Sequence, residues 1–208
     1  MKKTLIALLA LTGIAAAGTN EEVITMPEAK TACTFQPEFG IEYLYGHADC
    51  SDEMDTQGIR ASIGTTLNTN SAFSHTFSLN LGYDWGDKAD IVNGNSANLE
   101  ENKTTITLGY DLNYALTDKV TLYVGAKAGY ATGELELSRP ARNFAAKEDL
   151  EGFTYSVGGG VKYQITENVH LKAGYEFNRS YLGHIGPNKE ENYLPCVHVF
   201  SVGVGYKF

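Results

Sequence analysis

The sequence predicts an all-β fold: an eight-stranded antiparallel up-and-down transmembrane β-barrel with short periplasmic turns and long extracellular loops. Three observations predict it. Apolar and polar residues alternate with a period of two in eight segments, which is typical of strands with one apolar face. The connections between the segments alternate between short and long, and an export signal precedes them. No later apolar run has the about 20 residues that a membrane helix needs, so a spanning chain must be a closed barrel.

The first 17 residues have the composition of a secretory signal peptide. Lys2 and Lys3 form a basic start, residues 5–14 are mainly apolar, and residues 15–17 are three alanines that suit a cleavage site. We therefore expect a mature chain that begins near Gly18. Removing two lysines changes the formal charge from −9 to −11 (−9 − 2), a balance that argues against nucleic-acid binding.

The remaining chain divides into a lead-in and one domain. Residues 18–34 contain Pro27 and show no sustained period, so we expect a short periplasmic N-terminal segment. Residues 35–208 carry the eight alternating segments, and most are close to the about 9–11 residues with which a tilted strand crosses a bilayer. The expected strands are 35–45, 56–67, 77–85, 106–116, 120–130, 153–165, 169–177 and 196–208.

The connections and the aromatic residues indicate how the barrel would sit in a membrane. Short polar turns are expected at 68–71, 117–119 and 166–168, and long loops at 46–55, 86–103, 134–151 and 178–195. Short turns on one rim and long loops on the other are typical of transmembrane barrels. Aromatic residues also gather near the strand ends, where interfacial girdles are expected. They are Tyr83, Trp85, Tyr130, Phe153, Tyr155 and Phe177 at the outer ends, and Tyr114, Tyr163, Tyr206 and Phe208 at the inner ends.

With these features, residues 35–208 resemble the small OmpA/OmpX-like outer-membrane barrels. The last strand alternates to the final residue, and its Tyr206 and Phe208 resemble the signal by which the barrel-assembly machinery recognises its substrates. The resemblance implies a monomer in a Gram-negative outer membrane, surrounded by lipid and lipopolysaccharide, whose loops bind an extracellular surface ligand. We expect no peptidoglycan-binding domain and no cofactor.

The phase of each strand predicts which charged side chains face the lumen. They are Glu42, Arg60, Asp84, Asp111, Lys127, Lys162, Lys172, Glu176 and Lys207. Charges in a narrow interior must pair because they lose hydration, and an eight-stranded ring is just wide enough for side chains to fill it. We therefore expect a salt-bridged polar plug. A small porin that conducts through the same network is the alternative, whereas an apolar ligand cavity is disfavoured because almost no large apolar side chains face inward.

A lipid A-modifying enzyme is a third hypothesis, because small outer-membrane barrels include such enzymes. Deacylases of this size use a His and a Ser two positions apart on one strand, whereas His198 and Ser201, like Ser74 and His75, fall on opposite faces. The palmitoyltransferase class carries an amphipathic helix before its barrel and an apolar interior, and neither is evident here. The five histidines are interpreted as rim, loop or interfacial residues. We predict no catalytic site and no enzyme.

The expected loops offer three further interpretations. Asp49, Asp52, Glu53 and Asp55 form a solvated acidic rim or, less favoured, a divalent-cation site. Basic residues of 134–151, namely Arg139, Arg142 and Lys147, contact lipopolysaccharide phosphates or belong to a mixed-charge surface. The stretch 179–195 is aromatic and marked by Gly and Pro, which makes it the best adhesive candidate by composition.

The three cysteines are an odd number for an exported protein, and their spacing matches no zinc motif. Ring closure would place the last strand beside the first. Cys50 follows the outer end of the first strand, and Cys196 begins the last. We predict a Cys50–Cys196 disulfide across this seam, with Cys33 left alone.

Overall fold

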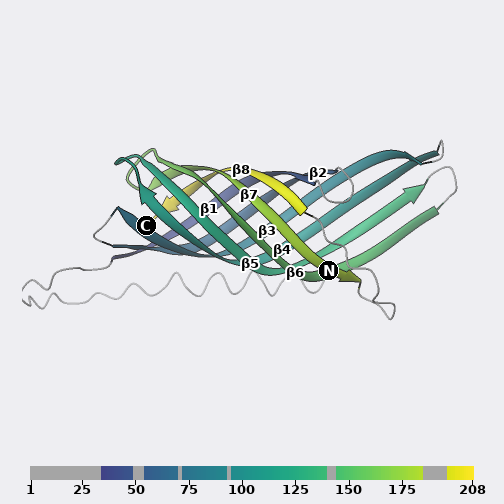
Figure 1. Cartoon of the computed structure of the whole chain (residues 1–208), viewed down its shortest axis with the longest axis horizontal. Coiled ribbons are helices and arrows are strands. Elements are labelled where there is room, and N and C mark those ends of the chain that lie inside the picture. The colour runs from purple at the N-terminus through teal and green to yellow at the C-terminus, as the bar shows by residue number, and fades with distance from the viewer. Residues whose placement is uncertain (1–33, 49–53, 70–71, 93–94, 140–143, 185–195) are drawn as a thin grey trace, which may run out of the picture. The chain divides into compact units, whose positions relative to one another are not determined.

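The computed structural model describes residues 34–48, 54–69, 72–92, 95–139, 144–184 and 196–208. They form one closed ring of antiparallel strands in chain order, in which β8 returns to pair with β1 (Figure 1). The strands are β1 (Thr34–Ala48), β2 (Met54–Asn68), β3 (Phe73–Val92), β4 (Asn95–Ala115), β5 (Val120–Arg139), β6 (Phe144–Gln164), β7 (Val169–His184) and β8 (Cys196–Lys207). The predicted fold class is confirmed. The expected signal peptide lies outside the described residues.

The two faces of the wall differ as the alternation predicts. Large apolar side chains point outward along every strand; Leu108 is 70% exposed and Val124 is 61% exposed. Charged side chains such as Glu42 and Arg60 are instead buried inside the ring. An apolar exterior around a polar interior suits a lipid environment and is the reverse of a water-soluble domain. No helix among the described residues is long and apolar enough to cross a membrane.

Two of the expected long loops are strand instead. The pairing of β3 with β4 continues to Val92↔Asn95, and that of β5 with β6 continues to Arg139↔Phe144. Interpreting 86–103 and 134–151 as loops was therefore wrong. Outside the hydrocarbon the outer face of a strand needs no apolar residues, so these extensions pair through the backbone without the apolar alternation that marked the lipid-facing strands. At one end, the two hairpins reach beyond the other strands (Figure 1).

The ring is closed by β1 and β8 in a register that runs from Glu38↔Lys207 to Ala48↔Val197. At the end with the short turns, Tyr206 and Phe208 point outward, and their ring centroids lie 5.0 Å apart. The end with the short turns corresponds to the expected periplasmic end, and the end with the long hairpins corresponds to the expected extracellular end.

Candidate functional site

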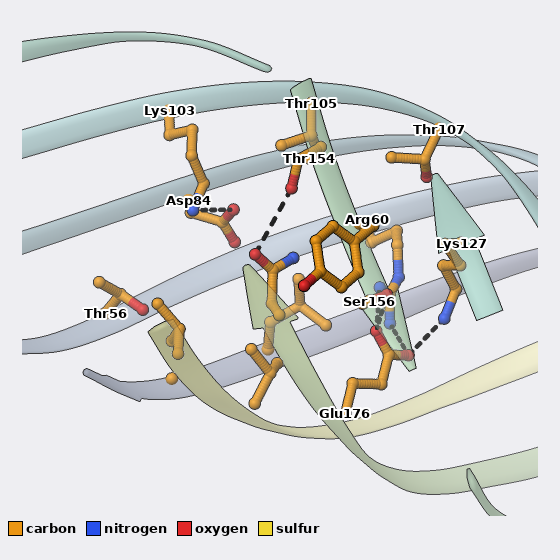
Figure 2. A pocket seen from close by; sticks show the side chains of 16 residues that line it. Thr56, Arg60, Asp84, Lys103, Thr105, Thr107, Lys127, Thr154, Ser156 and Glu176 are labelled. Carbon is orange, nitrogen blue, oxygen red and sulfur yellow. Dashed lines mark hydrogen bonds and ion pairs between the residues drawn. The ribbon is translucent and has the colours of Figure 1, made fainter. Parts of the chain in front are cut away.

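The centre of the lumen holds a network of charged side chains built on Arg60 of β2. The guanidinium donates two hydrogen bonds of 2.9 Å to the Glu176 carboxylate on β7, and its Nε donates one of 3.0 Å to Glu42 on β1. Lys127 of β5 also donates to Glu176. The alternation aims each side chain inward, and ring closure then brings four strands to one point. Figure 2 shows the contacts of Arg60 and Lys127 with Glu176.

Lys172 of β7 extends the network toward the periplasmic end. Its Nζ lies 2.8 Å from the Glu42 carboxylate and 3.8 Å from that of Asp111. It also lies 4.6 Å from the centroid of the Tyr123 ring, close enough for a cation–π interaction. Paired in this way, the central charges form a cross-link between opposite walls.

Tyr123 of β5 has room inside the ring because glycines face it: Gly160 lies directly opposite it on β6, and Gly174 lies opposite Gly160 on β7. A Cβ atom at Gly174 would lie 2.1 Å from the Tyr123 hydroxyl, and one at Gly160 would lie 2.8 Å from it. The aromatic ring therefore occupies space that any larger residue at Gly174 would take. With the ion pairs beside it, this ring occupies part of the lumen on the side of the Arg60 centre that has the short turns.

A second ion pair lies on the extracellular side of the centre. Lys103 Nζ is 3.7 Å from the Asp84 carboxylate (Figure 2). Lys103 was not among the expected lumen residues, because it fell in the segment interpreted as a loop. The residues around this pair, including Thr56 and Thr105, line a cavity of about 40 Å³. A cavity of this size holds only one or two water molecules.

The predicted lumen residues all face inward, but they are not all paired. The structure brings Glu42, Arg60, Asp111, Lys127, Lys172 and Glu176 together. Asp84 pairs separately with Lys103. Lys162 lies opposite Lys172, but no carboxylate of the described residues is within ion-pair distance of it.

Some inward residues were missed although the period of two could have found them, and Tyr123 and His170 are the clearest cases. Tyr123 is in phase with Lys127, and His170 is in phase with Lys172. His170 is only 3% exposed, so its interpretation as a rim or interfacial residue was wrong. It lines a second cavity, of about 20 Å³, with Glu42 and Lys162.

Part of the extracellular end of the lumen is apolar, although Glu101 and Lys103 are also buried there. Ala131, Leu150 and Leu182 form a cluster of buried side chains, against which Leu135 packs. Further apolar side chains are buried toward this end; they are Leu44, Ala48, Met54 and Val197. The expectation that almost no large apolar side chains face inward was wrong. Several of these residues belong to segments that were interpreted as loops, so their side chains were not assigned to the inner or the outer face of the barrel.

The histidine and serine pairs considered for catalysis lie as their spacing predicts. Ser201 is buried inside the ring, whereas His198 faces outward and its Nδ1 contacts the hydroxyl of Tyr175. His75 also faces outward, where its Nδ1 lies 2.8 Å from the hydroxyl of Tyr110. Neither pair shares a face, so neither forms the His/Ser pair that the deacylases use. The described residues contain no cluster of three or more His, Cys, Asp or Glu side chains arranged to hold a metal.

Most of the expected loop features lie outside the described residues. These are Asp49, Asp52, Glu53, Arg142 and most of 179–195. Of the rest, the Asp55 carboxylate lies 2.7 Å from His47 Nδ1 on the outer face. Lys147 donates a hydrogen bond of 2.7 Å to Glu134, and this exposed carboxylate raises the pKa of Lys147. Lys147 therefore already has an anionic partner on the chain itself.

Cys196 is disulfide-bonded. Its predicted partner, Cys50, lies outside the described residues, as does Cys33. The described pairing of β1 with β8 ends with Ala48 opposite Val197. In the sequence, Cys50 is two residues after Ala48 and Cys196 is one residue before Val197. The Cys50–Cys196 pairing stays a prediction.

A closed ring with an apolar exterior and a charged interior defines the class: a transmembrane β-barrel. The model of the outer membrane protein beta-barrel domain matches residues 5–208, so the chain belongs to that family. Membership places the protein in the outer membrane of Gram-negative cells.

Solved structures of similar fold include three other outer-membrane barrels. Ail, the attachment invasion locus protein of Yersinia pestis, is 14% identical, with a TM-score of 0.48, over 84% of this chain and 97% of its own. Neisserial surface protein A is 18% identical, with a TM-score of 0.49, over 86% and 100%. The outer membrane enzyme PagL is 16% identical, with a TM-score of 0.47, over 81% and 98%. At these values the likeness carries no inference about activity. No curated protein matched the chain.

Proposed function

We propose that this protein is a structural and surface-display barrel of the outer membrane, with a lumen that is closed to solutes. The observation that carries the proposal is the network in which Arg60 binds both Glu42 and Glu176 while Lys127 and Lys172 bind the same two carboxylates. These contacts join opposite walls, and the Tyr123 ring lies beside them.

Opening this network would separate buried charges. Arg60, Glu42 and Glu176 are each less than 10% exposed. Because a buried charge without its partner is strongly unfavourable, the paired arrangement is the stable one. The cavities on its two sides are small, of about 40 and 20 Å³, which supports a closed lumen.

The apolar part of the extracellular end adds a second barrier. An ion that passed the network would still meet the cluster of Ala131, Leu150 and Leu182. Apolar constrictions exclude ions because water leaves them. Two barriers of different chemistry in series favour the closed lumen over the small porin.

Display is supported by the long hairpins. From Trp85 at the outer girdle, β3 continues to Val92, which is roughly 20 Å along the strand. Backbone pairing continues to Val92↔Asn95, so β3 and β4 form a paired stem beyond the lipid-facing strands. A stem of this kind suits binding of an extracellular surface ligand, or contact with lipopolysaccharide that supports membrane integrity.

The remaining parts of the proposal concern biogenesis and chemistry. The outward Tyr206 and Phe208 are the residues that the barrel-assembly machinery would recognise on the last strand.

We propose a monomer without enzymatic activity. In each of the two His/Ser pairs considered for a lipid A enzyme, the histidine and the serine lie on opposite faces of the strand.

Single-channel recording of the refolded mature protein in a planar bilayer tests the closed lumen. We expect a heat-modifiable, folded barrel that gives no discrete openings. Reproducible openings that disappear in Lys127→Met or Glu176→Gln, but persist when the exposed turn residue is changed in Lys119→Met, would instead establish the small porin.

A further inference from the structure

Lys162 of β6 is a buried cation without a carboxylate partner. The residue is 6% exposed, and its Nζ has no ion pair or hydrogen bond within the described part of the chain. Within the described part of the chain, its Nζ contacts the Tyr123 ring, whose centroid lies 5.5 Å away. Because burying an uncompensated ammonium group is unfavourable, such a side chain calls for a counterion.

The neighbouring lysine explains why Lys162 lacks one. Lys162 and Lys172 lie directly opposite each other on β6 and β7. Lys172 turns toward Glu42 and Asp111 and takes both carboxylates. Glu38, the remaining acid nearby, accepts a hydrogen bond of 3.1 Å from Thr66 and does not reach Lys162 within ion-pair distance.

Lys162 borders a cavity of about 160 Å³ at the periplasmic mouth of the barrel. The cavity is also lined by Lys207 of β8 and by Thr121, which lies directly opposite Lys162 on β5. Amide groups of Asn113 and Gln164 complete its polar wall, and no acidic side chain is among the described residues that line it.

We propose that this cavity, between Lys162, Lys207 and Thr121, binds a small tetrahedral oxyanion of the phosphate or sulfate type. Two ammonium groups supply the charge, and the Thr121 hydroxyl supplies a donor that makes no protein hydrogen bond in the described part of the chain. Lysine ammonium and threonine hydroxyl are common phosphate contacts in proteins. Since the cavity lies inside the ring, its occupant comes from the periplasmic solution and not from a lipid headgroup.

The test titrates inorganic phosphate into the refolded barrel in an uncharged maltoside detergent and follows backbone amide NMR shifts. Ionic strength is held constant with sodium chloride. We expect saturable shifts at Thr121, Lys162 and Lys207. In Lys162→Met, phosphate should bind roughly tenfold or more weakly, because a hydrogen bond to a charged group is lost. The control, Lys119→Met, removes the same charge from an exposed turn and should bind as the unchanged protein does.

The outcomes separate this site from general attraction to a basic surface. Absence of saturable shifts, equal effects of phosphate and chloride, or equal losses in Lys162→Met and Lys119→Met would each overturn the proposal. Should Lys162→Met fail to refold, the double variant Thr121→Val/Lys207→Met takes its place, and full phosphate binding by that variant would overturn the proposal. The bilayer recording remains independent, since a closed lumen can hold this anion or lack it.

Discussion

The guanidinium of Arg60 and the carboxylate of Glu176 lie 2.9 Å apart, although 116 residues separate them in the sequence. Their strands, β2 and β7, are not neighbours in the ring, so the contact spans the lumen. It is joined to Glu42 on one side and Lys127 on the other. A single residue thus ties together walls that backbone hydrogen bonds do not join.

Replacing Arg60 should destabilise the barrel strongly. Arg60→Ala leaves Glu42 and Glu176 buried without their main partner, and breaking a buried pair in this way costs about 3–5 kcal/mol. Urea unfolding in lipid vesicles, followed by the fluorescence of Trp85, the single tryptophan, measures the loss. Lys119→Ala in an exposed turn is the control, expected to change stability by less than about 0.5 kcal/mol. Equal costs for the two variants would contradict the central role of Arg60.

A Cβ atom at position 174 should compete with the Tyr123 hydroxyl for the same space. We expect Gly174→Ala to cost about 1–3 kcal/mol, the usual range for overpacking a filled interior. The same change should cost much less in a Tyr123→Phe background, where the hydroxyl is gone. A double-mutant cycle measures the coupling. Gly183→Ala serves as the control, because a Cβ atom at Gly183 would meet no other part of the protein within 4 Å. Additive costs would show that the two residues do not meet.

The apolar cluster at the extracellular end should stabilise the hairpin stems. Leu182→Ala removes a side chain that is 1% exposed and should cost about 2–5 kcal/mol in urea unfolding. It should also speed trypsin cleavage at Lys147, whose strand packs against this cluster. Leu108→Ala, at a lipid-facing position that is 70% exposed, leaves no cavity. If Leu108→Ala speeds cleavage as much as Leu182→Ala does, the cluster does not hold the hairpin.

Peptide mapping of the unreduced protein should recover Cys196 joined to Cys50, with Cys33 as a free thiol. Linking the two ends of the barrel wall closes a long loop, so Cys196→Ser should lower the free energy of unfolding by about 2–5 kcal/mol. Cys33→Ser is the matched control and should leave stability unchanged. Recovery of a Cys33–Cys196 peptide would show the seam prediction to be wrong.

The fold could be predicted from the sequence because lipid acts on every outward position of the spanning strands. Val124 and Leu108 meet hydrocarbon, which allows few polar residues, so the period of two is regular there. The described parts of 86–103 and 134–151 lie beyond the lipid-facing stretch, so they pair through the backbone without a regular apolar outer face, although inward residues such as Lys103 and Leu150 are buried. Strand length was therefore underestimated at the extracellular end, and Leu150 went unassigned.

The candidate site could be predicted only in part. Phase indicates that Lys162 and Lys172 both face inward, and the structure agrees. The period of two does not indicate which of these lysines reaches Glu42. The choice of lysine depends on the register of β1 against β8 and on the tilt of the strands. Tyr123 could have been found from its phase, but the space that admits it comes from Gly174 on a strand that is not adjacent.

Closure of the ring through β1 and β8 also has a consequence for folding order. The pairing Glu38↔Lys207 joins residues near opposite ends of the barrel sequence, so the ring cannot close before the last strand is available. Until then, β1 and β7 each expose an unpaired edge that can add a strand from another chain. Contacts of such long sequence separation form slowly. The unclosed chain is therefore the form most exposed to aggregation, and the arrival of the final twelve residues ends that exposure.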